Sequence, residues 1–206
     1  MKKTITLFIL LISAALFSQD FEGKIVYKNS CRSKNPDWKK EYCQMITDSS
    51  QVYYFKNGDY KYLDNNTAKW TLFKKSDNKI YTKADKIYWI DVASNEDEIL
   101  DIQVNKKKFV VLGYECDELI LKCKSSTQKY YFNSVTAINP KWFENHKHGN
   151  LNKIMAITKS IPLKTLFIIE DQNFELESTA TEIKKGKVDD KLFELPKDIE
   201  IKEGKK

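Results

Sequence analysis

The stretch QVYYFKNGDYKYL, residues 51–63, decides the fold class of this sequence. Two runs rich in tyrosine, phenylalanine and valine flank Asn57-Gly58, the dipeptide most typical of a two-residue turn between antiparallel strands. Aromatic and β-branched side chains favour strands. The stretch therefore predicts a β-hairpin with strands over 51–56 and 59–63.

Runs of similar composition continue in both directions, separated by clusters of Asn, Asp, Gly and Ser, which is typical of an antiparallel all-β chain. Further strands are expected over 21–28, 68–74, 79–82, 86–90, 107–112, 114–122, 128–132, 163–170 and 174–183. Helices are expected to be few and short, over 36–45, 141–145 and 152–160, with a last turn capped by Asp189-Asp190. Asn-Pro pairs at 35–36 and 139–140 are good helix starts, because asparagine caps and proline suits the first helical position.

Several predicted strands carry aromatic residues on both faces, as in Tyr53-Tyr54-Phe55 and Tyr88-Trp89. A sheet with one wet face should alternate apolar and polar residues. This pattern predicts either a sheet packed on both sides or a sheet that encloses a ligand-sized cavity, and the two readings stay open. By strand position, the candidate residues lining such a cavity are Tyr54, Tyr62, Trp70, Phe73 and Tyr88.

The first 18 residues have the three parts of a secretory leader. Lys2 and Lys3 are followed by the apolar run Ile5–Phe17, which is shorter than the ~20 residues needed to span a bilayer. Residues 1–18 are therefore predicted to be a cleaved signal peptide, and 19–206 a single β domain without a transmembrane anchor. No cysteine sits just after the apolar run, so a soluble periplasmic or secreted protein is expected rather than a lipid-anchored lipoprotein.

The four cysteines form an even set, which in an exported chain predicts disulfides. Cys31 and Cys43 lie 12 residues apart and are the favoured pair. Elimination leaves Cys116 with Cys123, but seven extended residues span about 23 Å, whereas bridged Cα atoms lie within about 7 Å. That bridge needs a turn or bulge, or else these thiols pair differently.

Composition and motifs exclude several classes of function. The net charge is +6, yet Arg32 is the only arginine among 35 basic residues, which argues against a nucleic-acid binder and for a solubilising coat of lysines. We find no phosphate loop, nucleophile elbow or zinc-protease motif. His146 and His148 are interpreted as surface-loop residues rather than metal ligands. No metal, no cofactor and no enzymatic activity are predicted.

Two segments carry a resemblance to a known family. Residues 111–117, VLGYECD, are similar to the I-x-G-Y-x-C-x-K segment of the GLPGLI family of exported Gram-negative envelope proteins. Residues 188–196, VDDKLFELP, resemble the V-D-D-x-x-F-x-x-P close of related lipoprotein-carrier-like domains. The motif that gives the family its name is absent, and residues 160–164 read SIPLK in its place. Arg32 matches no arginine motif of the carrier, so no role is transferred to it.

The resemblance implies the lipoprotein localisation factor fold: mainly β (α+β), with a strongly curved antiparallel sheet or half-barrel and a few short helices covering one side. It also implies a periplasmic binding module whose concave face holds a lipid or the acyl part of a lipoprotein. The alternative is a structural or protein-interaction module of the envelope, with a filled core and no small-molecule ligand.

Overall fold

The computed structural model describes residues 20–33, 43, 50–64, 69–94, 97–171 and 173–204. Within these residues the protein is mainly β, and its twelve strands form one sheet that is not closed into a barrel. The strands are β1 (Gly23–Ser33), β2 (Ser50–Lys56), β3 (Asp59–Asp64), β4 (Trp70–Lys74), β5 (Lys79–Lys83), β6 (Ile87–Asp91), β7 (Ile99–Val111), β8 (Tyr114–Cys123), β9 (Thr127–Phe132), β10 (Lys164–Ile169), β11 (Phe174–Lys185) and β12 (Ile201–Glu203). Their order in the sheet is β12-β6-β5-β4-β3-β2-β1-β11-β10-β9-β8-β7.

The helical elements are short and lie mainly between β9 and β10. They are α3 (Leu151–Thr158) and the 3₁₀ turns η2 (Ser134–Thr136), η3 (Pro140–Phe143), η4 (His148–Asn150) and η5 (Asp190–Phe193). The predicted caps form, since the side chains of Asn139 and Asp189 accept hydrogen bonds from the backbone at the starts of η3 and η5. The predicted helix at 152–160 is confirmed as α3. The predicted leader (1–18) and all of the predicted helix at 36–45 except Cys43 lie outside the described residues.

The predicted hairpin is confirmed with its register. Asn57 and Gly58 both have positive φ, 51° and 90°, as the expected turn requires. Gly58 is also needed sterically, because a Cβ there would lie 2.8 Å from the Cβ of Trp142 in η3. Tyr53 pairs with Tyr62, so these two side chains project from the same face of the sheet.

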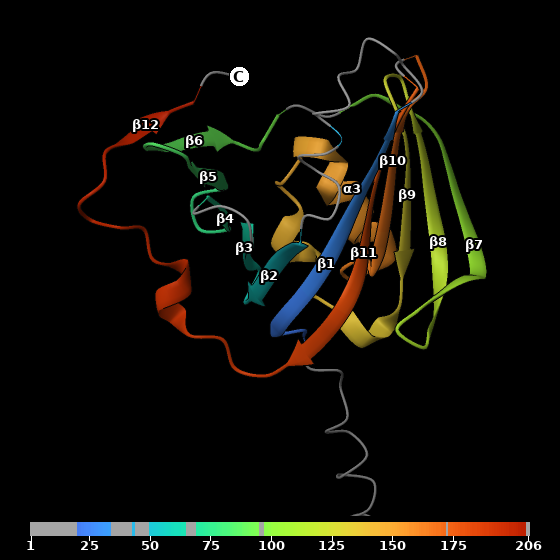
Figure 1. The fold of residues 1–206 in the computed structure, drawn as a ribbon, viewed down its shortest axis with the longest axis horizontal. Coiled ribbons are helices and arrows are strands. Elements are labelled where there is room, and N and C mark those ends of the chain that lie inside the picture. Colours follow the sequence, from blue (N-terminus) through green and yellow to red (C-terminus); the bar gives the residue numbers. More distant parts are fainter. Residues whose placement is uncertain are drawn as a thin grey trace, which may run out of the picture.

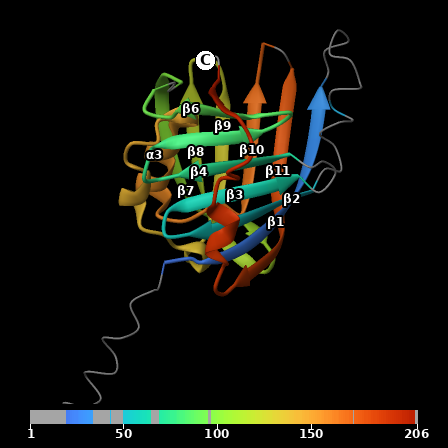
Figure 2. The same ribbon diagram turned by 90° about the vertical axis from the view of Figure 1, so that its left-hand side faces the viewer.

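The direction of the strands changes along the sheet. Figure 2 shows β2, β3, β4 and β6 running across the view, whereas β9, β10 and β11 run up it. The helix α3 contacts both regions, since Met155 belongs to the core cluster that includes Phe55 and Phe73, whereas Ile154 packs with Leu119 of β8. In Figure 1, α3 lies among these strands. We call the face of the sheet toward α3 the inner face and the opposite one the outer face.

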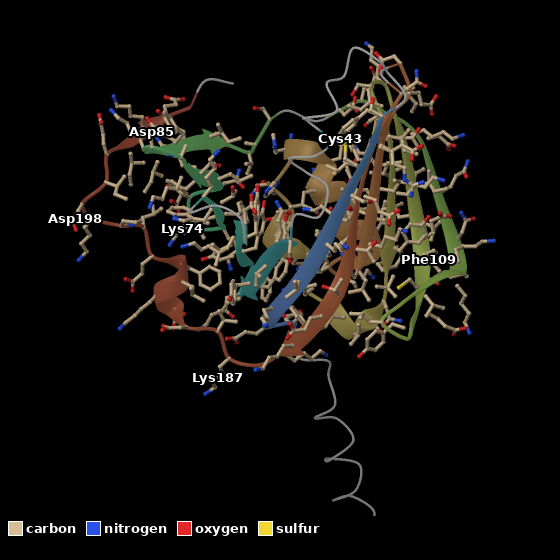
Figure 3. All side chains as sticks on the ribbon, viewed as in Figure 1. Cys43, Lys74, Asp85, Phe109, Lys187 and Asp198 are labelled. Atoms are coloured by element: carbon tan, nitrogen blue, oxygen red, sulfur yellow. A yellow bond between two sulfur atoms is a disulfide. The ribbon has the colours of Figure 1, made fainter. Side chains whose placement is uncertain are left out.

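The outer face of β2–β6 is covered by the C-terminal segment, residues 187–204 (Figures 1 and 3). Val188 and Phe193 pack in one buried cluster with Trp70 and Leu72. The segment ends in β12, which pairs in parallel with β6 and is the one parallel pairing among the described strands. This part of the sheet is therefore packed on both sides, as one of the two readings of the aromatic pattern predicted.

Three lysines of the outer face bind main-chain carbonyls of the C-terminal segment rather than forming a solvent coat. Lys56 donates to the carbonyl of Val188 (2.8 Å), Lys61 to that of Leu192 (2.9 Å) and Lys74 to that of Phe193 (3.3 Å). Lys56 also forms ion pairs with Asp190 at 2.7 Å and Glu22 at 3.7 Å, and the Lys61 ammonium lies 4.3 Å from the centroid of the Trp70 ring. The carbonyls at the end of η5 are thus satisfied by cations, which suit a helix C-terminus.

The cysteines correct one prediction. Cys31 and Cys43 form the predicted disulfide, with Cα atoms 5.1 Å apart. Cys116 and Cys123 are not bridged but are buried free thiols. Both lie on the single strand β8, which runs from residue 114 to 123 without a turn between them, so extension along the strand holds them apart.

We predict that Phe193→Ala lowers the free energy of unfolding by about 3–5 kcal/mol, because it empties the centre of the outer-face cluster. Urea unfolding monitored by circular dichroism measures the change. Ile201→Ala is the control, since Ile201 is 40% exposed and its truncation should cost under about 0.5 kcal/mol. Equal, small losses in both variants would contradict the packing of the C-terminal segment on the outer face.

Candidate functional site

A cavity of about 250 Å³ lies between the inner face of the sheet and the helical segment. Its walls come from β1, β2 and β3 on one side, from α3 and η3 on another, and from β9–β11. The lining residues are Tyr27, Gln51, Tyr53, Phe55, Tyr60, Tyr62, Tyr130, Phe143, Leu151, Ile154, Met155, Ile161, Pro162, Thr165 and Ser178. None of the described residues that line it carries a formal charge at neutral pH.

The hairpin register places the tyrosines of the cavity wall. Successive residues of a strand project to opposite faces, so Tyr53 and Phe55 share the inner face with Tyr60 and Tyr62. The rings of Tyr53 and Tyr62 stack with centroids 4.7 Å apart, and Tyr27 meets Tyr53 edge-on at 5.2 Å. Such pairs stabilise by about 0.5–1.5 kcal/mol beyond their burial. The wall is therefore a packed aromatic surface.

The phenol groups of this wall are neutral at physiological pH. Burial raises the pKa of Tyr27, Tyr53 and Tyr60 well above the ordinary value for tyrosine. Three of the hydroxyls have defined partners: Tyr27 donates to the carbonyl of Pro162 at 2.7 Å, Tyr130 donates to Gln128 at 2.7 Å, and the Tyr60 hydroxyl lies 3.1 Å from Nε2 of His146. The cavity is thus apolar and uncharged, with a few hydroxyls at its edge.

His146 lies behind this wall and corrects the interpretation of it as a surface-loop residue. Its side chain is 2% exposed, and its ring centroid is 4.6 Å from that of Phe73. Nε2 lies 3.1 Å from the hydroxyl of Tyr60, and Nδ1 has no hydrogen-bond partner among the described residues. Burial lowers its pKa to about 4, so the imidazole is neutral at pH 7. His148 is half-buried.

The five predicted ligand-binding residues divide between the two faces. Tyr62 lines the cavity, and Phe73 lies on the same face, buried against Tyr60. Tyr88 shares that face by its pairing with Thr82, but it does not line the cavity. Tyr54 and Trp70 project from the outer face, where they pack with the C-terminal segment. The structure does not bring the five together.

Of the predicted residues only Tyr62 lines the cavity, and the cavity tyrosines that the sequence analysis missed are Tyr27, Tyr53, Tyr60 and Tyr130. A signal for two of them was present, because a two-residue turn at Asn57-Gly58 fixes the register and makes Tyr53, not Tyr54, the neighbour of Tyr62. Tyr130 comes from a strand far along the chain and no local pattern could have paired it with this hairpin.

The described residues offer little for metal or acid–base chemistry at this site. No group of three or more His, Cys, Asp or Glu side chains that could hold a metal ion occurs among residues placed in the structure. The nearest titratable pair, Tyr60 with His146, consists of a phenol and an imidazole that burial keeps neutral. What this arrangement can do is hold an uncharged apolar group against aromatic rings. Across the described chain, no helix is long and apolar enough to cross a membrane.

No protein-family model and no curated protein sequence matches the chain. Among solved structures, the chain is similar to one titled "Structure of PNGF-II in P21 space group", with 15% sequence identity and a TM-score of 0.47. That similarity covers 89% of this chain and 32% of the other, so the chain spans about a third of that protein's length.

We predict that the protein loses stability as the pH falls from about 6.5 to about 4, because the folded pKa of His146 lies below its unfolded value of 6.5. Protons then bind the unfolded chain more tightly, and a shift of this size corresponds to about 3 kcal/mol. The loss begins below the unfolded pKa and levels off below the folded one. Unfolding free energies measured across this range provide the test.

His146→Phe should remove most of this slope, whereas His148→Gln should keep it. An unchanged slope in His146→Phe would show that His146 does not titrate as a buried imidazole.

Proposed function

We propose that this chain is an exported envelope protein that binds a small apolar ligand in the cavity of the inner face. The observation that carries the proposal is the cavity of about 250 Å³ lined by neutral aromatic and aliphatic side chains. Ligand pockets in proteins are concave and mostly apolar, with a few polar groups that fix orientation. Here Gln51, Thr165 and Ser178 would supply those polar groups.

The size of the cavity narrows the class of ligand. Pockets for drug-sized ligands run from about 300 to 1,000 Å³, so this cavity suits a single ring or a short stretch of acyl chain. A whole phospholipid or the full acyl part of a lipoprotein would require α3 to move away from β1–β3. We therefore propose a short apolar group as the occupant in this conformation.

We also propose that the sheet has the half-barrel shape of a ligand-binding fold. The sheet would form a strongly curved, open half-barrel, with α3 and η3 covering its concave side. Met155 of α3 belongs to the same core cluster as Phe55 of β2 and Phe73 of β4, and Ile154 to that of Leu119 of β8, which supports that description. The same arrangement is what the resemblance to lipoprotein-carrier-like domains implies, and Ile161 and Pro162, from the segment SIPLK, contribute to the cavity wall.

Export is proposed from one feature of the sequence and one of the structure. Residues 1–18 have the composition of a cleaved leader. The disulfide between Cys31 and Cys43 supports an oxidising compartment, such as the periplasm or the extracellular space.

The alternative, an interaction module of the envelope, has support from a different part of the molecule. This alternative expects a filled core, and the outer face of the sheet is filled, because the C-terminal segment packs on Trp70 and Leu72. On the inner face the cavity favours a ligand instead. The two functions are separated by whether the cavity takes up a small molecule.

We predict that decanoate and toluene, used as separate probes, each shift the ¹³C signal of the Met155 methyl group in a saturable way. Met155 lines the cavity, and the chain has only three methionines, so Met155→Leu assigns its signal. Thr165→Phe should weaken the binding by about tenfold or more, which corresponds to about 1.4 kcal/mol, because the added ring occupies the cavity.

The matched control is Ala156→Phe, which adds the same ring on the exposed side of α3. It should leave the shift unchanged. The absence of a saturable shift with either probe, or equal binding by the Thr165→Phe and wild-type proteins, would contradict the proposed site.

A further inference from the structure

β7 forms one edge of the sheet, and its first half carries an exposed apolar row. One side of β7 pairs with β8, and no other described strand lies along its second side. Leu100, Ile102 and Val104 are 65%, 46% and 46% exposed. β7 is the outermost strand on the right of Figure 1, and Figure 3 labels Phe109 on it.

One stretch of this edge, residues 101–105, lacks the usual protection against pairing with another strand; register irregularities flank it, and lysines follow it at 106–108. Edge strands are commonly protected by lysine or proline, by bulges or by shortness. Residues 99–105 contain neither lysine nor proline, and the strand is regular from Asp101 to Asn105, between two irregularities in its register. The opposite edge, β12, has only three residues. The stretch 101–105 therefore presents main-chain donors and acceptors on the side away from β8, beside the apolar side chains of Ile102 and Val104.

We propose that this edge pairs with β7 of a second copy of the chain, antiparallel and about a two-fold axis at Gln103, which goes beyond the proposed ligand binding. Ile102 and Val104 lie opposite Leu121 and Leu119 of β8, on the inner face. A two-fold axis perpendicular to the sheet keeps the inner faces of both copies on the same side. It therefore brings the Ile102 and Val104 of one copy against those of the other.

The alternation of apolar and polar side chains along β7, together with its charges, favours a second copy of β7 in antiparallel orientation. A slip of one residue would place apolar side chains opposite polar ones. Glu98 is exposed just before the strand, and the lysines at 106–108 follow the apolar row. Within one chain, Glu98 pairs with Lys124 at 3.7 Å, Lys106 with Asp117 at 2.7 Å and Lys107 with Glu115 at 3.1 Å, all on exposed side chains. Antiparallel pairing brings Glu98 of each copy toward the lysines at 106–108 of the other, whereas parallel pairing would place like charges together. β7 of one copy is thus complementary in charge to an antiparallel β7 of a second copy.

The association is expected to be weak, because the interface is small. One strand pair of this length buries less than the 1,200–2,000 Å² typical of stable interfaces. Leu100 and the two inner-face residues supply its apolar part. We therefore expect a reversible dimer whose population depends on protein concentration.

Sedimentation equilibrium of the full chain over a range of concentrations tests the proposal. The wild-type chain should fit a monomer–dimer equilibrium, and Ile102→Lys combined with Val104→Lys should weaken the association by at least tenfold. Val110→Lys is the matched control, because Val110 is 60% exposed on the same strand but lies beyond the paired segment. It should dimerise like the wild type. Circular dichroism establishes that each variant is folded.

Cross-linking provides a second readout of the axis. Gln103→Cys should form an oxidised dimer, since its position lies next to its own copy at the axis, and Val110→Cys should not. A chain that stays monomeric at every concentration, a dimer that persists in the double lysine variant, or equal cross-linking of both cysteine variants would overturn the proposal. Binding of decanoate at the cavity is measured separately, so failure of one proposal leaves the other intact.

Discussion

The structure depends on the burial of two apolar faces by the same set of strands. The turn at Asn57-Gly58 fixes the register of β2 and β3, and this register sends Tyr53 and Tyr62 to one face and Tyr54 to the other. Neither face can be left in water without losing roughly 25 cal/mol for each Å² of apolar surface. Each therefore requires a cover, and the chain supplies the two covers from different segments.

The two covers differ in how completely they fill the space beneath them. On the outer face an extended segment follows the sheet closely, and the three lysines at 56, 61 and 74 hold its carbonyls. On the inner face a short helix has to contact strands that run in two directions, since Met155 and Ile154 pack on different parts of the sheet. A rigid cylinder cannot follow both surfaces, and the cavity is the space that remains.

Local signals in the sequence were sufficient to predict most of the strands and turns. They were insufficient to predict which distant residues pack against one another. The hairpin, the caps at Asn139 and Asp189, and the disulfide of Cys31 with Cys43 all follow from residues close in sequence. The burial of His146, by contrast, depends on strands β3 and β4 far from it along the chain.

Elimination paired Cys116 with Cys123, although the extended span between them already argued against that bridge. The structure agrees with the argument from the span, because β8 is unbroken and both thiols are free. The candidate site was predicted only in part, because the face to which each side chain projects was not considered. Tyr62 was found by its strand, whereas Tyr54 and Trp70 were assigned without regard to which face the hairpin register gives them.

The central claim is that the space beneath α3 is a binding site rather than a packing defect. Native mass spectrometry of the protein recovered from its own cells, without detergent or organic solvent, tests this claim most directly. We expect a fraction of the protein to carry one additional small apolar molecule, which is released on mild activation. This fraction should be reduced in Thr165→Phe and retained in Ala156→Phe. A protein recovered only at its bare mass, with the two variants indistinguishable from the wild type, would contradict it.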